Sequence, residues 1–328
     1  MHGSGRAVRR FALAALAGIL GATQPGWAQD AAYPNRPIRM IVGFAAGGGN
    51  DLFARVIGQK LSEQIGQTVV IENKPGAGGR LAVDFVKNQP ADGYTLMVGA
   101  TGQMSVAAAI YPNLGYHPTR DFVPITMIAS FPLILAGPVD DKIKAVKDLV
   151  AFGKANPDKS NYATSSPAFT ITTELFKLKT GAPGTPIPYK SSNESLVSVI
   201  GEQSLLTIAD PPPTTPLVKG GQVRALAVLA KDRSPDLPDV PTMTEAGVPD
   251  VNVSLWSGMF APAGTPPDIV KKLEAELMKI MRMPDVQEKF KAMATPTVGS
   301  TAAEFTRVIE EETKMWSDVG RTANVKLE

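Results

Sequence analysis

The sequence predicts an α/β protein built as two Rossmann-like lobes joined by crossover strands. Apolar runs of strand length alternate with amphipathic stretches of helix length, which is typical of βα units and parallel sheets. Two extended apolar segments, residues 130–137 and 253–261, bracket the middle of the chain and are suited to connect two lobes. We therefore expect a first lobe of residues 29–129 plus 255–328 and a second lobe of residues 130–254.

The first lobe is predicted to open with three βα units. Strands are expected over residues 38–43, 68–72 and 95–99, and helices over residues 51–65 and 81–88. A long apolar segment, residues 123–136, is broken at Pro132 and precedes an amphipathic helix over 145–155.

Alternation then resumes in the predicted second lobe. Strands are expected over residues 161–164, 185–189, 205–208 and 223–229, and helices over 169–179, 194–200 and up to 219. Residues 234–249 are rich in Pro, Asp and Gly and predict a loop with at most a short helix at 242–246. A strand over 253–261 and then helices, including 268–282 and 302–319, complete the pattern.

The N-terminal residues have the pattern of an export signal. Three arginines precede an apolar core at residues 11–20, and Gly-Trp-Ala at 26–28 matches a small-x-small cleavage signature. A membrane anchor would need a longer apolar stretch, because spanning takes roughly 18 residues. We expect a signal peptide over residues 1–28, cleaved near Ala28, and a periplasmic protein; the pair Arg9-Arg10 leaves a twin-arginine signal as the second interpretation.

Charge and composition exclude several function classes. Of 33 basic residues three leave with the signal, so 30 remain against 31 acidic residues, and no basic field for nucleic acid results. Cysteine is absent, which excludes thiol nucleophiles and thiolate metal sites. His117 is the only histidine after the signal; it lies in a turn-like stretch without nearby acidic partners and is expected to be a solvated loop residue. Metal-ligand spacings such as HExxH and EF-hand loops are missing, so we expect no metal and no cofactor.

The first glycine-rich loop, residues 44–51, predicts an anion site. Its sequence is Phe-Ala-Ala-Gly-Gly-Gly-Asn-Asp, between a strand and a helix. Glycines let backbone N–H groups approach a ligand, and the following helix adds partial positive charge. Asn50 or Asp51 could equally be the helix N-cap. The loop has neither GxGxxG spacing nor a following Gly-Lys-Ser/Thr, which argues against a nucleotide.

Three further segments are candidate binding elements. The loop at 73–80 resembles the first one in build, although it could be only a tight βα turn. Residues 163–170 place Ser165, Ser166 and Thr170 around a helix start with a proline in its first turn; Ser166 could be an ordinary N-cap. Asp210 lies at a strand end, just before three prolines that open a helix.

A set of short motifs gives the chain a family resemblance. They are Tyr-Pro-Asn-Arg-Pro-Ile at 33–38, Phe-Ala-Ala-Gly-Gly at 44–48, Asp51 to Arg55, Glu-Asn-Lys-Pro-Gly-Ala-Gly-Gly at 72–79, Asp-Phe-Val-Pro at 121–124, Pro-Tyr-Lys at 188–190, Arg-Ala-Leu-Ala-Val at 224–228, Pro-Asp-Val-Pro-Thr at 238–242 and Trp-Ser-Gly at 256–258. This colinear set resembles the Bug or TctC-type receptors of tripartite tricarboxylate transporters.

The resemblance implies a type II periplasmic-binding-protein fold that closes on a carboxylate. Members of the family hold a ligand carboxylate largely through backbone N–H groups and ordered water at the loop that matches residues 44–51. The implied first-lobe binding residues are Phe44, Ala46, Gly47, Gly48 and Asp51, with Thr101 and Gly102 after the third strand; Asn50 of the same loop is a further candidate. Asp51 could instead recognise an amino or amide group, or cap its helix.

The predicted second lobe departs from the family pattern. Where relatives have a Ser/Gly-rich run, this chain has Thr-Ser-Ser-Pro-Ala-Phe at 164–169; the usual glycine after Pro-Tyr-Lys is Ser191; and the segment that normally reads Gly-Gly-Gln-x-Asp is Ile-Gly-Glu-Gln-Ser at 200–204. We hypothesise that Phe169 forms an apolar wall that favours a larger or aromatic dicarboxylate over malate.

These observations predict a periplasmic solute receptor that binds a carboxylate, delivers it to the membrane components of a tripartite tricarboxylate transporter and has no enzymatic activity. Hinge closure between the lobes would complete the site. A receptor that feeds a signalling partner is the main alternative. An α/β enzyme is disfavoured, since a Ser-His-Asp site would have to use His117.

Overall fold

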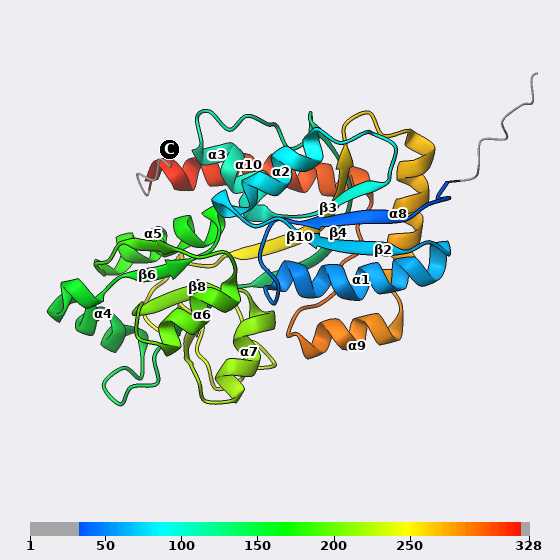
Figure 1. Ribbon diagram of the computed structural model, residues 1–328. Helices are drawn as coiled ribbons and strands as arrows, with labels where there is room; N and C mark the ends of the chain where they lie inside the picture. The colour runs from blue at the N-terminus through cyan, green and yellow to red at the C-terminus, as the bar shows by residue number, and fades with distance from the viewer. Residues whose placement is uncertain (1–32, 323–328) are drawn as a thin grey trace, which may run out of the picture. The chain divides into compact units, whose positions relative to one another are not determined.

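The computed structural model describes residues 33–322, which form two five-stranded sheets with helices packed around them (Figure 1). The predicted signal peptide lies outside the described residues. The helices that the structure describes include none long and apolar enough to cross a membrane.

The first sheet has the strand order β2-β1-β3-β10-β4. Its strands are β1 (Ile38–Val42), β2 (Val69–Asn73), β3 (Thr95–Ala100), β4 (Phe122–Pro132) and β10 (Ser254–Pro262). The helices associated with it are α1 (Gly49–Ile65), α2 (Arg80–Lys87), α3 (Ala107–Ile110), α8 (Pro267–Met281), α9 (Pro284–Ala292) and α10 (Ala302–Thr322), with short helical turns η1 (Ala77–Gly79) and η2 (Gly102–Val106). Of these helices α8 and α10 pack on β4, so the C-terminal part of the chain returns to the first sheet.

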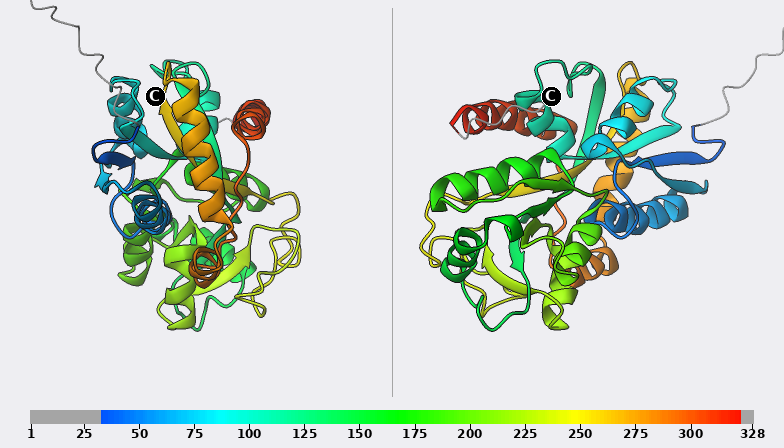
Figure 2. Two further views of the ribbon diagram at one scale, coloured as in Figure 1. Left: turned by 90° about the vertical axis from the view of Figure 1, so that its right-hand side faces the viewer. Right: turned by 60° about the vertical axis from the view of Figure 1, so that its left-hand side comes forward.

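The second sheet has the order β7-β6-β8-β5-β9. Its strands are β5 (Ile134–Gly137), β6 (Tyr162–Thr164), β7 (Pro186–Pro188), β8 (Leu206–Ala209) and β9 (Arg224–Val228). Its helices are α4 (Val146–Ala155), η3 (Pro157–Lys159), α5 (Pro167–Thr180), α6 (Ser192–Ile200) and α7 (Pro211–Lys219). Figure 2 shows this green part of the chain from two further sides.

The two sheets share one topology, and each differs from the predicted parallel sheet in one strand. β10 runs antiparallel to both β3 and β4, and β5 runs antiparallel to both β8 and β9. The apolar runs predicted these strands but not their direction, because a run that is buried on both faces reads the same in either orientation.

The chain crosses between the sheets at the break that Pro132 predicted. β4 ends at Pro132 in the first sheet, and β5 begins at Ile134 in the second. The return passes through residues 229–253, where the Leu229 N–H donates to Leu133 O (2.8 Å) and the Val253 N–H donates to Leu229 O (3.0 Å). β10 lies wholly in the first sheet and is therefore not itself a crossover strand. The predicted lobe boundaries stay a prediction.

Apolar side chains on α1 attach this helix to the first sheet. Phe53, Ile57 and Leu61 follow one another at four-residue spacing and are fully buried. The helix ends where Gly66 adopts a left-handed conformation (φ 68°) and its N–H donates to Ser62 O. Burial of this stripe fixes the direction of α1, whose N-terminus lies at the carboxyl end of β1.

Candidate functional site

A cavity lies where helix N-termini attached to the two sheets meet. The first residues of α1 contribute to it from one side, and those of α5 and α6 from the other. The lining residues are Phe44, Gly48, Gly49, Asn50, Ala100, Thr101, Gly102, Phe131, Ser166, Phe169, Ser192, Asp210, Leu255 and Trp256. Among the residues that the structure describes, this lining includes no lysine, arginine or histidine.

Small residues let the two sides approach closely. A Cβ atom on Gly48 would lie 3.4 Å from Ser191 Cβ, and one on Gly102 would lie 3.0 Å from Ser166 Oγ. Two hydrogen bonds cross the cleft directly: the Ala45 N–H donates to Lys190 O (3.0 Å), and the Gly49 N–H donates to Asp210 Oδ2 (3.0 Å). The structure therefore represents a closed arrangement around the cavity.

The predicted glycine-rich loop and the first residues of α1 form one side of the cavity. Gly48 is the N-cap of α1 in an extended conformation and has no side chain that could cap the helix. Within the first turn, the Gly49 N–H donates to Asp210 Oδ2 across the cleft, and the Asp51 N–H donates to Gly48 O. Asn50 points its amide oxygen to Ser257 Oγ, which donates to it at 2.7 Å. The predicted residues Phe44, Gly48 and Asn50 all line the cavity.

Asp51 supports this loop from behind and is not among the cavity-lining residues. Its carboxylate accepts hydrogen bonds from the Gly47 N–H (3.0 Å), from Arg55 (2.9 Å) and from Asn73 Nδ2 (2.9 Å). Burial alone would raise the pKa of Asp51, but these donors hold it below its ordinary value. Asn73 also donates to Phe44 O (2.9 Å), so the network fixes the loop conformation.

Thr101 and Gly102, which directly follow β3, line the cavity. The family resemblance implied both as binding residues. Thr101 Oγ1 accepts from the Trp256 N–H (2.7 Å) and donates to Trp256 O (3.2 Å), which ties the end of β3 to β10. Trp256 and its neighbour Leu255 complete the apolar wall on this side.

The α5 side is built around Ser166, which is the N-cap of that helix. Its Oγ accepts from the Phe169 N–H (3.4 Å), and Pro167 occupies the first helical position. Ser166 and Phe169 line the cavity, and Phe169 is 8% exposed. The N-cap interpretation of Ser166 is therefore confirmed, and the same side chain also faces the cavity.

Four predicted binding residues, besides Asp51, lie outside the lining. Ala46 and Gly47 belong to the loop but are not among the lining residues, and a Cβ on Gly47 would lie 3.8 Å from Asn193. Thr170 Oγ1 donates to Ser166 O (3.1 Å), and Ser165 Oγ is buried without a hydrogen-bond partner among the described residues. Their predicted contact with a ligand stays a prediction.

The sequence interpretation missed part of the lining, namely Gly49, Ala100, Phe131, Ser192, Leu255 and Trp256. Ser192 had a detectable signal, because Ser191 is the N-cap of α6 and Glu194 follows three positions later. Ser191 Oγ accepts from the Glu194 N–H, and the Glu194 carboxylate accepts from the Lys190 N–H, as in a capping box shifted by one residue. This pattern predicts a helix N-terminus at Ser192, two residues earlier than we expected.

The second glycine-rich loop does not line the cavity. A Cβ on Gly78 would lie 2.8 Å from the ring of Pro167, so this loop packs against the start of α5. The Arg80 guanidinium lies 3.9 Å above the ring of Tyr111. Its position supports the interpretation as a βα turn.

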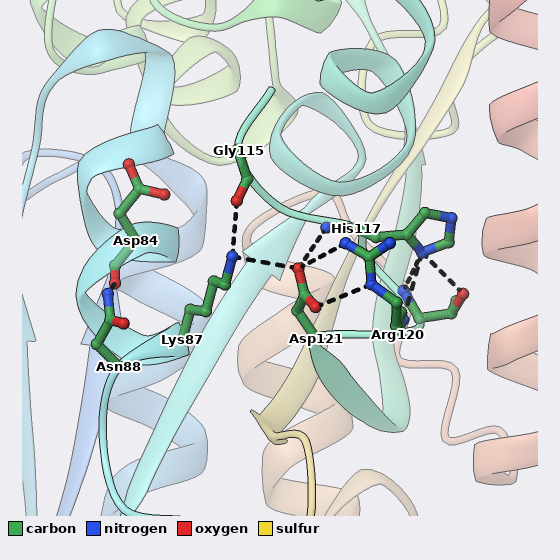
Figure 3. Close-up of polar contacts among 8 residues, drawn as sticks. Asp84, Lys87, Asn88, Gly115, His117, Arg120 and Asp121 are labelled. Carbon is green, nitrogen blue, oxygen red and sulfur yellow. Dashed lines mark hydrogen bonds and ion pairs between the residues drawn. The ribbon is translucent and has the colours of Figure 1, made fainter. Parts of the chain in front are cut away.

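His117 lies in an exposed turn, as expected, and its ring Nδ1 faces the backbone N–H groups of Thr119 and Arg120. Figure 3 shows that its backbone N–H donates to the Asp121 carboxylate (2.8 Å), which also pairs with Lys87 and Arg120. The Arg120 hydrogen bond is the largest cause that lowers the pKa of Asp121, to about 2. This cluster closes the turn before β4. The described residues contain no group of three or more side chains suited to hold a metal ion.

Fold and cavity together define a two-lobed solute-binding receptor of the periplasmic-binding-protein type. The chain belongs to the tripartite tricarboxylate transporter receptor family, TctC, whose pattern matches residues 53–325. The predicted family and fold class are confirmed. Because the family and its structural neighbours are solute receptors, the expectation that this chain is not an enzyme is confirmed as well.

Three solved structures show the similarity. Rpa4515 of R. palustris, solved with adipate, is 33% identical with a TM-score of 0.86, and the match covers 90% of this chain and 99% of that one. The periplasmic binding protein BugD is 32% identical with a TM-score of 0.86, covering 90% and 100%. MatC from Rhodopseudomonas palustris, with bound malate, is 30% identical with a TM-score of 0.84, covering 88% and 99%.

Proposed function

We propose that this protein binds a carboxylate, specifically a dicarboxylate, in the cavity between its two sheets and delivers it to the membrane components of a tripartite tricarboxylate transporter. The observation that carries the proposal is the convergence of the α1, α5 and α6 N-termini on a cavity whose described lining residues include no cationic side chain. Helix N-termini stabilise anions through N–H groups and aligned dipoles. Backbone donors remain neutral, so an empty site buries no unpaired cation.

The ligands of two relatives support this chemistry. Rpa4515 was solved with adipate and MatC with malate, both dicarboxylates. In the proposed receptor, one ligand carboxylate lies at the loop of residues 44–50, and Ser166 and Ser192 face the distal part of the ligand. The lobes, taken as residues 29–129 plus 255–328 and residues 130–254, open and close around the ligand by a hinge motion. The signal over residues 1–28 would direct the protein to the periplasm.

Phe169 is the proposed determinant of ligand size. Together with Phe44, Phe131 and Leu255 it gives the cavity an apolar wall. Such a wall favours ligands with a longer aliphatic or aromatic body between or beside the carboxylates, since burial of that body contributes roughly 25 cal/mol per Å².

A thermal-shift screen tests the proposal. The purified protein is heated with mono-, di- and tricarboxylates, aliphatic and aromatic, at several concentrations. A ligand that binds the folded state raises the apparent Tm with concentration. A shift confined to one carboxylate subclass, with the compound recovered unchanged, supports the receptor function and identifies the ligand class. A flat response to every carboxylate, while the folded protein unfolds cooperatively, contradicts it.

Phe169→Gly is the matching variant for ligand size. We expect it to lose preference for larger dicarboxylates over malate, while Phe85→Gly, on a half-buried surface of α2, leaves the preference unchanged. Equal preferences in the Phe169→Gly variant and the parent protein would contradict the role of Phe169 but not carboxylate binding itself.

A further inference from the structure

Asp210 lines the cavity with a buried carboxylate that does not cap the helix it precedes, α7. It is the N-cap of α7, a position where an aspartate side chain normally accepts hydrogen bonds from the next backbone N–H groups. Here the first three helical residues are Pro211, Pro212 and Pro213, which have no N–H. No side-chain cap hydrogen bond forms. The carboxylate is thereby available to the cleft.

One oxygen of this carboxylate is paired across the cleft and the other is not. Oδ2 accepts from the Gly49 N–H at the start of α1, at 3.0 Å. Oδ1 is buried and has no hydrogen-bond partner in the described part of the chain. The residue is 2% exposed, and burial raises the pKa of its carboxyl group, against the opposing effects of Ser192 and the Gly49 N–H. A buried carboxylate oxygen without a donor is unfavourable, so a bound molecule that supplies the donor gains affinity.

Among the described residues, the lining contains no lysine, arginine or histidine that could pair with Asp210. The Ser192 hydroxyl is a neutral donor beside the carboxyl group and opposes the rise of its pKa, but Oδ1 has no hydrogen-bond partner in the described part of the chain. A cationic or further donor for Oδ1 is therefore left to the ligand. The N–H of Gly49, which Asp210 contacts, belongs to the same helix N-terminus that we assign to the ligand carboxylate. Substituents next to that carboxylate therefore lie within reach of Oδ1.

We propose that Asp210 is a specificity-determining residue that selects carboxylates carrying a hydroxyl or ammonium donor next to the carboxylate. This inference rests on the proposed carboxylate-binding function of the same cavity. The ligand carboxylate takes the helix N-termini, and the neighbouring donor gives its hydrogen to Asp210 Oδ1. A ligand without such a donor leaves Oδ1 unpaired and brings its negative charge towards another carboxylate.

The test uses matched ligands that differ in one substituent: succinate, malate and aspartate, and separately adipate, 2-hydroxyadipate and 2-aminoadipate. Affinities are measured by isothermal titration calorimetry. We expect the full protein to prefer the substituted member of a series by roughly tenfold over the unsubstituted one, as one charge-assisted hydrogen bond would give. If the protein prefers only the amino compounds, the donor that Asp210 selects is an ammonium group. If it prefers the hydroxy and amino compounds equally, a hydroxyl is sufficient as the donor.

Asp210→Asn is the decisive variant. Gly49 N–H requires an oxygen opposite it, so the amide NH2 takes the place of Oδ1 and presents a donor to the ligand. The preference should fall to about twofold or invert in favour of succinate and adipate, whose carboxylates accept from that amide. Asp84→Asn, on the exposed face of α2, is the matched control and keeps the parent preference.

An unchanged ratio of affinities in Asp210→Asn overturns the inference, and so does a parent protein that binds the unsubstituted compounds as tightly as the substituted ones. If Asp210→Asn fails to fold, Asp210→Ser, which is smaller and uncharged, serves instead; retention of the tenfold preference in that variant likewise overturns it. Failure of the proposed function has a different signature, because then no compound of either series binds the parent protein or any variant.

Discussion

The indole Nε1 of Trp256 donates a hydrogen bond to Glu312 Oε2 at 2.6 Å. Trp256 lies in β10 and lines the cavity, whereas Glu312 lies on the C-terminal helix α10. Burial of Glu312 raises its pKa from 4.5 to about 7, although the indole hydrogen bond acts in the opposite direction. The wall of the cavity is therefore attached to a carboxyl group that titrates near neutral pH.

Glu312→Gln should make the folded state less sensitive to pH. Because the pKa of Glu312 is raised on folding, the folded protein binds the proton more tightly, and stability falls as pH rises from about 4.5 through 7. Glutamine still accepts from Trp256 but cannot ionise. Above pH 7.5 the variant should be more stable than the parent by on the order of 3 kcal/mol, and the advantage should vanish below pH 4.5.

Urea unfolding between pH 4 and pH 8.5 measures this difference. Glu310→Gln, an exposed position on the same helix, is the control and should follow the parent at every pH. Parallel stability curves for Glu312→Gln and the parent would show that Glu312 does not titrate in this range.

Gly49→Ala should prevent closure of the cleft. A Cβ at this position would lie 2.0 Å from Asp210 Oδ2 and 3.4 Å from the ring of Pro212, so the closed contact cannot be kept. Alanine is favourable in a helix, so α1 itself should not be destabilised. We expect ligand affinity to fall roughly tenfold or more, since binding must then use a more open arrangement, while the Tm without ligand stays within about 2 °C of the parent.

Calorimetric titration with the carboxylate found in the screen, together with small-angle scattering, reports on affinity and closure. Gly201→Ala is the control, because the nearest neighbour of its added Cβ is Val197 O at 3.4 Å. Parent affinity in Gly49→Ala would mean that the Gly49–Asp210 contact is not needed in the bound state.

Gln103→Met should destabilise the protein without adding or removing much volume. Gln103 is fully buried; its Oε1 accepts from the Ala100 N–H (3.0 Å), and its Nε2 donates to Gly79 O (2.9 Å). Methionine would leave both backbone groups unpaired, at a cost of about 2–4 kcal/mol. Chemical denaturation measures this loss of unfolding free energy. Gln89→Met is the control, because the Gln89 side chain is half-buried and its amide donates a hydrogen bond to Phe85 O. This variant should lose less than about 1 kcal/mol. A similar loss in both variants would refute a special role for Gln103.

Phe53→Ala should be among the most destabilising single substitutions in the first sheet. The Phe53 ring stacks on Phe290 of α9, with centroids 5.0 Å apart, and contacts Phe131 of the cavity wall at 5.8 Å. Loss of a fully buried phenylalanine creates a cavity and costs about 3–5 kcal/mol. Equilibrium unfolding checks the value, and Phe85→Ala, on the half-buried face of α2, should cost clearly less. Equal costs would indicate that the core around Phe53 collapses to fill the space.

Local chemistry in the sequence was sufficient for much of the fold. Hydrophobic runs predicted β1, β3 and β8 to within one residue at each end, and the helix expected over residues 51–65 ends at Ile65, as α1 does. Ser166 before a proline predicted the start of α5. Each of these signals acts between residues that are close in the chain, so a window of a few residues contains it.

The sequence by itself determined the α/β class, the family and the glycine-rich loop that contributes Phe44, Gly48 and Asn50 to the cavity lining. Tertiary structure decided what pairs across long distances: the antiparallel direction of β5 and β10, the position of Asp51 behind the loop, and the pairing of Asp210 with Gly49, 161 residues away. The physical reason is that strand direction and cleft contacts depend on packing between segments far apart in the chain, which no local pattern records.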